Sequence, residues 1–97
     1  SPTLITVSAS WCSNCHQLDE DIYSSEEFKA KAKGIDKLRF DFTDPASAEN
    51  QKLAQKLKII GVPYLALIDK DGKIVKTHVG TFEKEDLFTW LEDLKKK

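Results

Sequence analysis

Two kinds of hydrophobic spacing follow one another along this chain, and together they predict a mixture of strands and helices. Four segments either alternate apolar and polar residues or carry β-branched or continuous apolar runs, as strands do. They are residues 3–8, 37–43, 64–69 and 73–79. In the second of them Leu38, Phe40 and Phe42 fall on one face, and an Asp-Lys-Asp-Gly turn joins the last two as a hairpin.

The segments between these strands have the spacing of helices. They are residues 13–23, 24–34, 44–60 and 83–97. In the first, Leu18 and Ile22 lie one turn apart on the face that also holds Cys15. The second opens on a Ser-Ser-Glu-Glu capping box, either as a new helix or as a kinked continuation, and Gly34 ends it. The third starts at an Asp-Pro pair, and the fourth is amphipathic.

This order of elements predicts an α/β fold. A parallel β-α-β half is followed by a hairpin, so helices cover both faces of a four-stranded mixed sheet. We expect the sheet order second, first, third, fourth. The strand at residues 3–8 then lies inside the sheet, and both cysteines follow its end. With 97 residues the chain is long enough for a single domain, residues 1–97, and too short for two.

Charge and hydropathy exclude two classes of partner. Fifteen basic and sixteen acidic side chains give a net charge of −1, so we expect no binding to nucleic acid. The longest apolar run, residues 59–68, is shorter than the roughly 18 residues that a membrane helix needs, so we expect a soluble protein. The chain starts at Ser1, almost within a strand, which indicates a piece of a longer protein.

The stretch Trp-Cys-Ser-Asn-Cys-His at residues 11–16 has three possible meanings: a haem attachment site, half of a zinc site, or a redox dithiol. Haem would need a further axial ligand, but the chain has no Met, and His78 lies on a strand. Structural zinc needs four ligands, and Cys12, Cys15 and His16 supply three at most. The Asp-Lys-Asp-Gly turn resembles a calcium loop but lacks the other ligands. We therefore expect no metal.

A redox dithiol needs only the two cysteines and none of the further ligands that haem or zinc would require. Cys12 is expected at the N-terminus of a helix, where the dipole and free backbone N–H groups lower a thiol pKa, and Cys15 is expected to be buried one turn later. Position therefore assigns the roles: Cys12 attacks a partner disulfide and Cys15 resolves the mixed disulfide. A disulfide that closes so short a loop stabilises a fold little, so the pair is better explained by chemistry.

The C-x-x-C motif after a strand, together with Gly61-Val62-Pro63 before the next long strand, resembles the thioredoxin superfamily. Within it, the run S-A-S-W-C-S-N-C-H-Q-L-D-E-D and the segment K-L-K-I-I-G-V-P are most similar to the C-terminal, periplasmic domain of the thiol:disulfide interchange protein DsbD. The resemblance extends from about Thr3 to Leu94 and implies a thioredoxin-like fold.

The resemblance also implies further site residues. Pro63 would follow a cis peptide bond, Val62 would offer its backbone groups to an extended partner segment, and Trp11 would form part of the docking surface. Asp19 falls where the resembling domain carries an acidic residue that would raise the pKa of the cysteines and accept the proton of Cys15. Thr6 stands where the family usually buries an aspartate, which puts that part of the family mechanism in doubt.

The function implied by the resemblance is that of a thiol:disulfide oxidoreductase without a cofactor. It would work as a reductant and as a monomer, passing electrons from a membrane-embedded donor domain to other thiol proteins in the bacterial periplasm. A free-standing thioredoxin-like reductase of another pathway, such as cytochrome c maturation, would share every residue named above. A non-enzymatic binding module on a thioredoxin scaffold is the third hypothesis.

Overall fold

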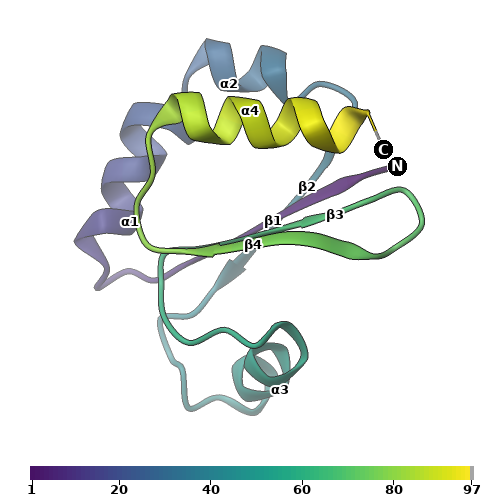
Figure 1. The fold of residues 1–97 in the computed structure, drawn as a ribbon. Coiled ribbons are helices and arrows are strands. Elements are labelled where there is room, and N and C mark those ends of the chain that lie inside the picture. Colours follow the sequence, from purple (N-terminus) through teal and green to yellow (C-terminus); the bar gives the residue numbers. More distant parts are fainter. Residues whose placement is uncertain (97) are drawn as a thin grey trace.

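The computed structural model describes residues 1–96 and shows a four-stranded sheet with helices on both faces (Figure 1). The elements in chain order are β1 (Thr3–Ser8), α1 (Ser13–Leu18), the π-helical segment η1 (Asp19–Tyr23), α2 (Glu26–Lys31), β2 (Asp36–Asp41), α3 (Ala48–Leu57), β3 (Tyr64–Ile68), β4 (Ile74–Val79) and α4 (Lys84–Lys95). Within residues 1–96, no helix is both long and apolar enough to cross a membrane.

The sheet has the order β2-β1-β3-β4, which confirms the predicted order and fold class. β1 pairs with β2 in parallel and with β3 in antiparallel fashion, and β3 and β4 form the expected hairpin. In Figure 1, α1, α2 and α4 lie on one side of the sheet and α3 lies on the other. β1 is thus an inner strand, and a short loop connects its C-terminal end to α1.

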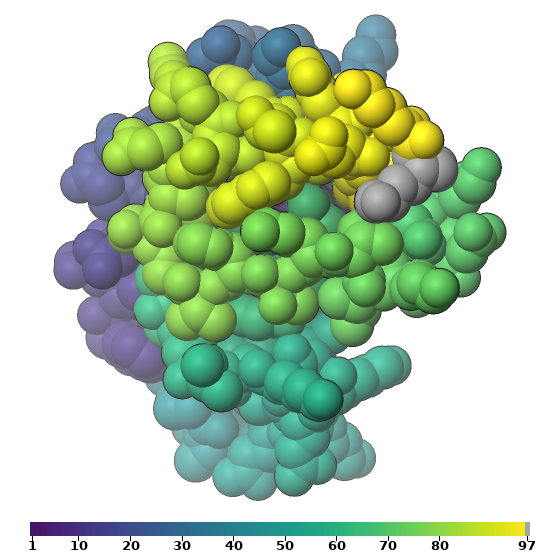
Figure 2. Space-filling view, in the orientation of Figure 1, coloured from purple at the N-terminus to yellow at the C-terminus, as the bar shows by residue number. Residues whose placement is uncertain are grey.

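Two hydrophobic clusters hold the helices to the sheet. Along β1 the side chains alternate, so that Leu4 joins the cluster that includes the residues of α4, whereas Ile5 and Val7 join the cluster on the α3 side. The buried residues of α4 are Leu87, Leu91 and Leu94. The space-filling view in Figure 2 shows α4 packed along the hairpin strand β4. Both cysteines belong to the second cluster, which ties the motif to the core.

The helix expected over residues 13–23 is divided. α1 ends at Leu18, and the chain continues as the π-helical segment η1, in which the Ser24 N–H bonds to the carbonyl oxygen of Asp19, five residues earlier. The predicted capping box is wrong: Ser25 is the N-cap of α2, and its hydroxyl oxygen accepts from the Phe28 N–H, so position N3 holds no carboxylate. Short π segments inside helices are frequent at functional sites.

Two further boundaries differ from the prediction. α3 begins at Ala48 rather than at Asp44, because Ser47 takes the N-cap position and its hydroxyl oxygen accepts from Asn50 N–H. α4 ends at Lys95, and the predicted continuation to Lys97 lies outside the described residues.

The predicted apolar face of β2 is only partly covered. Phe42 is buried and Phe40 half-buried, but Leu38 is 49% exposed. Leu53 and Ala54 of α3 pack against the cluster that contains Phe42, and Leu38 belongs to neither hydrophobic cluster. Because β2 is an edge strand, its outer part lacks the second layer that alternation in the sequence assumes.

Candidate functional site

The two cysteines lie where β1 gives way to α1, as predicted. Cys12 is the N-cap of α1, its backbone is extended, and its Sγ accepts from the Cys15 N–H at 3.2 Å. The two residues form a disulfide, with their Cα atoms 5.3 Å apart. The attacking position thus has a free helix N-terminus beside it, the environment that stabilises a thiolate.

Cys15 is buried, as predicted, and Cys12 is more enclosed than sequence reasoning expects for an attacking thiol. Cys12 is 7% exposed and Cys15 is 3% exposed. In the disulfide each sulfur covers the other, and both residues also pack in the cluster on the α3 side of the sheet. Cys12 is thus only slightly more exposed than Cys15, and the attacking role of Cys12 stays a prediction.

Trp11 lies beside the disulfide with 60% of its surface exposed. Its indole Nε1–H donates to the carbonyl oxygen of Thr43 at 2.9 Å, and the backbone N–H of Ser10 donates to the Thr43 hydroxyl oxygen at the same distance. These two bonds attach the C-x-x-C loop to the chain that leaves β2. The indole ring is therefore held at the surface with a fixed orientation and an uncovered face.

The Val62-Pro63 peptide bond is cis, as the resemblance implies. Pro63 is buried, and its carbonyl oxygen accepts from the Gly80 N–H at 2.8 Å, which attaches this loop to the end of β4. Pro63 and Cys15 line the same small cavity at the end of the sheet. Val62 is half-buried and packs against the cluster that contains both cysteines. The structure thus brings Cys12, Cys15, Val62 and Pro63 together from segments about 50 residues apart in sequence.

Asp19 lies one turn after Cys15, at the start of η1, and it has a partner that sequence reasoning missed. Its Oδ2 accepts from Nη2 of Arg39 on β2 at 2.9 Å. This hydrogen bond raises the pKa of the Arg39 guanidinium. Burial is the main cause that raises the pKa of neighbouring Tyr23, and the charge of Asp19 adds to it. Tyr23 is therefore neutral near pH 7.

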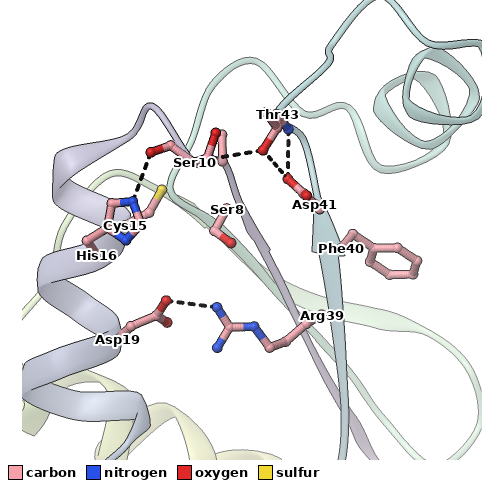
Figure 3. A pocket seen from close by; sticks show the side chains of 10 residues that line it. Ser8, Ser10, Cys15, His16, Asp19, Arg39, Phe40, Asp41 and Thr43 are labelled. Carbon is pink, nitrogen blue, oxygen red and sulfur yellow. Dashed lines mark hydrogen bonds and ion pairs between the residues drawn. The ribbon is translucent and has the colours of Figure 1, made fainter.

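A cavity of about 330 Å³ opens between α1 and β2, next to Cys15 (Figure 3). Its wall includes Cys15, His16 and Asp19 from the helical side and Arg39 and Asp41 from the strand. Figure 3 shows the Asp19 and Arg39 side chains reaching toward each other across this space. Asp41 accepts hydrogen bonds from the hydroxyl and the backbone N–H of Thr43, which lower the pKa of its carboxyl group.

Thr6 takes the position of the family's buried aspartate. It is half-buried on β1, lies opposite Arg39 in the register of the parallel pair, and lines the small cavity that also contacts Cys15 and Asp19. A hydroxyl group at this point neither carries charge nor accepts a proton at neutral pH. Among the described residues, Asp19 is the only one with a carboxylate that lines this small cavity.

The two histidines have structural contacts. His16 is exposed, and its Nε2 lies 2.9 Å from the Ser10 carbonyl oxygen, so in this arrangement Nε2 is the protonated nitrogen. His78 packs between Phe82 and Trp90, with ring centroids 5.7 and 5.1 Å away. Trp90 also holds the Lys76 ammonium group over its ring at 4.6 Å.

Two exposed apolar residues near the cis-proline loop also escaped sequence reasoning. Ile60 is 87% exposed, and Val79 is also exposed at the end of β4. The Cβ position of Gly61 lies 3.6 Å from Val79 Cγ1, so these two segments are adjacent. Sequence reasoning placed Ile60 at the end of a helix that instead stops at Leu57.

A family model described as a thioredoxin-like domain matches residues 1–95. The chain belongs to this thioredoxin-like family. The thiol:disulfide interchange protein DsbD of Actinobacillus pleuropneumoniae serotype 5b is 25% identical over 93 residues, which cover 94% of this chain and 16% of that protein. The thioredoxin of Rhodospirillum rubrum is 28% identical over 91 residues, which cover 94% of this chain and 80% of that protein. This thioredoxin-like chain thus spans about a sixth of the DsbD relative.

Solved structures confirm the fold of this thioredoxin-like chain. The C-terminal domain of Neisseria meningitidis DsbD in the oxidised form superposes with a TM-score of 0.81 at 19% identity, covering 97% of this chain and 80% of that chain. The reduced form gives a TM-score of 0.82 at 19% identity, with 96% and 80% covered. A thioredoxin from Thermus thermophilus gives 0.80 at 15% identity, with 97% and 73% covered. The predicted similarity to the thioredoxin superfamily and to DsbD C-terminal domains is therefore confirmed.

Proposed function

We propose that this chain is a thiol:disulfide oxidoreductase that acts through Cys12 and Cys15. One observation carries the proposal: the disulfide lies at the N-terminus of α1, next to a cis-proline loop, in a chain of the thioredoxin-like family. Its relatives named thiol:disulfide interchange proteins and thioredoxin support the same reaction class. The exchange needs no metal or cofactor, since the two sulfurs carry the electrons.

The reaction balances over two steps. In the reduced chain the Cys12 thiolate attacks one sulfur of a partner disulfide, a mixed disulfide forms, and the second partner sulfur leaves as a thiolate. Cys15 then loses its proton and attacks Cys12 Sγ, which forms the intramolecular disulfide and releases the first partner sulfur. The partner gains two electrons and the chain loses two. Asp19, on the same helical side as Cys15, is the proposed acceptor of the Cys15 proton.

Docking of the partner is proposed at the rim formed by Trp11, Ile60, Val62 and Val79. Trp11 precedes Cys12 directly, Ile60 and Val79 lie next to the cis-proline loop, and all three expose apolar surface. Val62 contributes backbone N–H and C=O groups for short β-augmentation. None of these four side chains is charged. Such a rim suits a partner segment with apolar residues beside its cysteine, and a small interface suits rapid release.

Replacing Ile60 with glutamine tests this rim. We expect kcat/KM with a protein disulfide substrate to fall about 5- to 10-fold, because part of the roughly 1.5–3 kcal/mol available from burying an isoleucine is lost at a transient contact. The rate with a small disulfide, which does not reach the rim, is expected to stay unchanged. Ile74→Gln is the matched control, since Ile74 is exposed at the other end of β4. Equal losses in both variants would contradict the assignment of Ile60.

The proposed cellular role is that of a reductant in the bacterial periplasm, fed by a membrane-embedded donor domain. The DsbD relatives and the structural similarity to DsbD C-terminal domains support this role. A second candidate, a free-standing thioredoxin-like reductase, is favoured by the Rhodospirillum rubrum thioredoxin, because this chain covers 80% of that protein. Reconstitution with a DsbD-type membrane domain separates the two: only the first role predicts rapid reduction by that domain.

The test of the proposed function is a redox titration of the disulfide combined with insulin reduction in the presence of dithiothreitol. We expect insulin reduction, and a potential near or below about −250 mV in equilibrium with a thiol buffer. A potential near −120 mV would assign an oxidant instead. If insulin is not reduced and the dithiol does not exchange with small disulfides, the chain is a binding module and the proposal is wrong.

A further inference from the structure

The ion pair between Asp19 and Arg39 joins the helical side of the site to the edge strand β2. Its 2.9 Å length sets it apart, since the other ion pairs within residues 1–96 are 3.5–3.8 Å long. The Asp19 side chain is 34% exposed and that of Arg39 is 54% exposed. This geometry directs the carboxylate of Asp19 toward the Arg39 guanidinium, which extends from β2 across the cavity, as Figure 3 shows.

The side chain of Arg39 lines three cavities. It lines the 330 Å³ cavity that reaches Cys15, the small cavity beneath Thr6 and Pro63, and an apolar cavity of about 290 Å³ below Tyr23. The other ionisable side chains that face Cys15 are His16 from α1, Asp41 from β2, Tyr23 from η1 and Tyr64 from β3.

Neither the two tyrosines nor Asp41 supplies a positive charge that could balance the negative charge of the Asp19 carboxylate. Burial raises the pKa of both tyrosines, so they are neutral near pH 7, and Tyr64 donates its hydroxyl to the Leu57 carbonyl oxygen. Asp41 adds negative charge, and it is bonded to Thr43. The only permanent positive charge on the walls of the two cavities that contact Cys15 is therefore Arg39, within the described part of the chain.

A lone carboxylate beside a thiol opposes its ionisation, because two negative charges repel each other. Cys15 must form a thiolate to resolve the mixed disulfide. An Asp19 carboxylate that is paired with a guanidinium presents little net charge to the thiol, whereas an unpaired one would slow the second step.

We propose that Arg39 is a positioning residue for the resolving step: it neutralises and holds the Asp19 carboxylate so that Cys15 ionises near neutral pH. The proposal rests on the proposed function, because it concerns the second step of that exchange. Neither the C-x-x-C motif nor the cis-proline loop predicts this role for Arg39.

The test uses the reduced full-length chain and 5,5′-dithiobis(2-nitrobenzoate). Cys12 attacks this disulfide and releases one thionitrobenzoate anion. Cys15 then attacks Cys12 Sγ, closes the intramolecular disulfide and releases the second anion, while its proton passes to Asp19 and from there to solvent, or directly to solvent where Asp19 is replaced. The rate of the second release, followed from pH 5 to 9 by absorbance in a stopped-flow instrument, reports the ionisation of Cys15.

In Arg39→Gln we expect the midpoint of this pH profile to rise by about 0.5–1 unit, less than the roughly 1–3 units that a neighbouring charge produces at a buried site, because both side chains of the pair are partly exposed. The second release at pH 7 is then about 3- to 10-fold slower. Adding Asp19→Asn to Arg39→Gln is expected to return the midpoint to or below that of the wild-type chain. Arg39→Lys is expected to keep most of the effect of Arg39.

Lys37→Gln is the matched control, because Lys37 lies on the same face of β2 and its ammonium group bonds to the Ile35 carbonyl oxygen instead of Asp19. Its profile is expected to match that of the wild-type chain. Coinciding profiles for Arg39→Gln and wild type would overturn the proposal, as would a midpoint that the added Asp19→Asn leaves raised. Failure of the proposed function looks different, since the wild-type chain would then release no second anion.

Discussion

Replacing Cys12 with serine is expected to lower the rate of protein disulfide reduction by about 1,000-fold or more, since the hydroxyl group is not a thiolate nucleophile at neutral pH. Cys12 is the N-cap of α1 and the slightly more exposed of the two cysteines, so the residual Cys15 thiol is expected to be the poorer attacking group. Insulin reduction with dithiothreitol measures the loss. The serine hydroxyl can also cap α1, so the fold is expected to survive.

Cys15→Ser is the matched variant, and it is expected to fail in a different way. Cys12 still attacks, but nothing resolves the adduct, so a mixed disulfide accumulates with a disulfide substrate and is visible by intact-mass spectrometry. Accumulation of that adduct in Cys12→Ser instead, attached at Cys15, would reverse the two roles. Wild-type turnover in either variant would remove the exchange mechanism altogether.

Leu91→Ala is expected to lower the free energy of unfolding by about 2–5 kcal/mol, because it leaves a cavity in the core between α4 and the sheet. Leu91 is fully buried in the cluster that also contains Leu4 and Leu65. For a chain of this size the midpoint of thermal unfolding is expected to fall by about 10 °C or more. Leu38→Ala is the control, since Leu38 is half exposed on the edge strand, and its effect is expected within about 0.5 kcal/mol.

The same measurement tests our proposal that residues 1–97 form a single domain. Trp11 lies beside the disulfide and Trp90 lies on α4, so each single-tryptophan variant, Trp11→Phe or Trp90→Phe, reports one region by fluorescence. We expect Leu91→Ala to shift both transitions equally. A shift seen only with Trp90 would show that α4 unfolds separately and would contradict the single domain.

The sequence predicts the sheet well because its information is local. Alternation, a hairpin turn and the handedness of a β-α-β unit are sufficient to order the four strands. The start of α3 is harder to predict, because Asp44, Ser47 and Pro45 all carry signals for a helix start, and competition among nearby hydrogen bonds selects Ser47. The π segment likewise depends on packing of Ile22 and Tyr23 that no local pattern records.

The residues of the site also differ in whether the sequence alone predicts them. Cys12, Cys15 and the cis bond before Pro63 follow from short motifs and from the family resemblance, whereas Arg39 does not. Its contact with Asp19 spans 20 residues and depends on the parallel register that sets Arg39 opposite Thr6. Only the three-dimensional arrangement shows that the Arg39 guanidinium on β2 pairs with the Asp19 carboxylate at the start of η1.

The partial exposure of the Asp19 carboxylate affects how the dithiol responds to the ionic strength of the solution. An acid buried in the sheet would be shielded from dissolved ions, whereas the Asp19 side chain, at the mouth of an open cavity, is in contact with the medium. Dissolved electrolyte weakens interactions between such exposed charges over about 10 Å at 0.1 M. With Arg39 acting as proposed, the reactivity of this dithiol therefore becomes sensitive to ionic strength, a property that a fully interior acid would not confer.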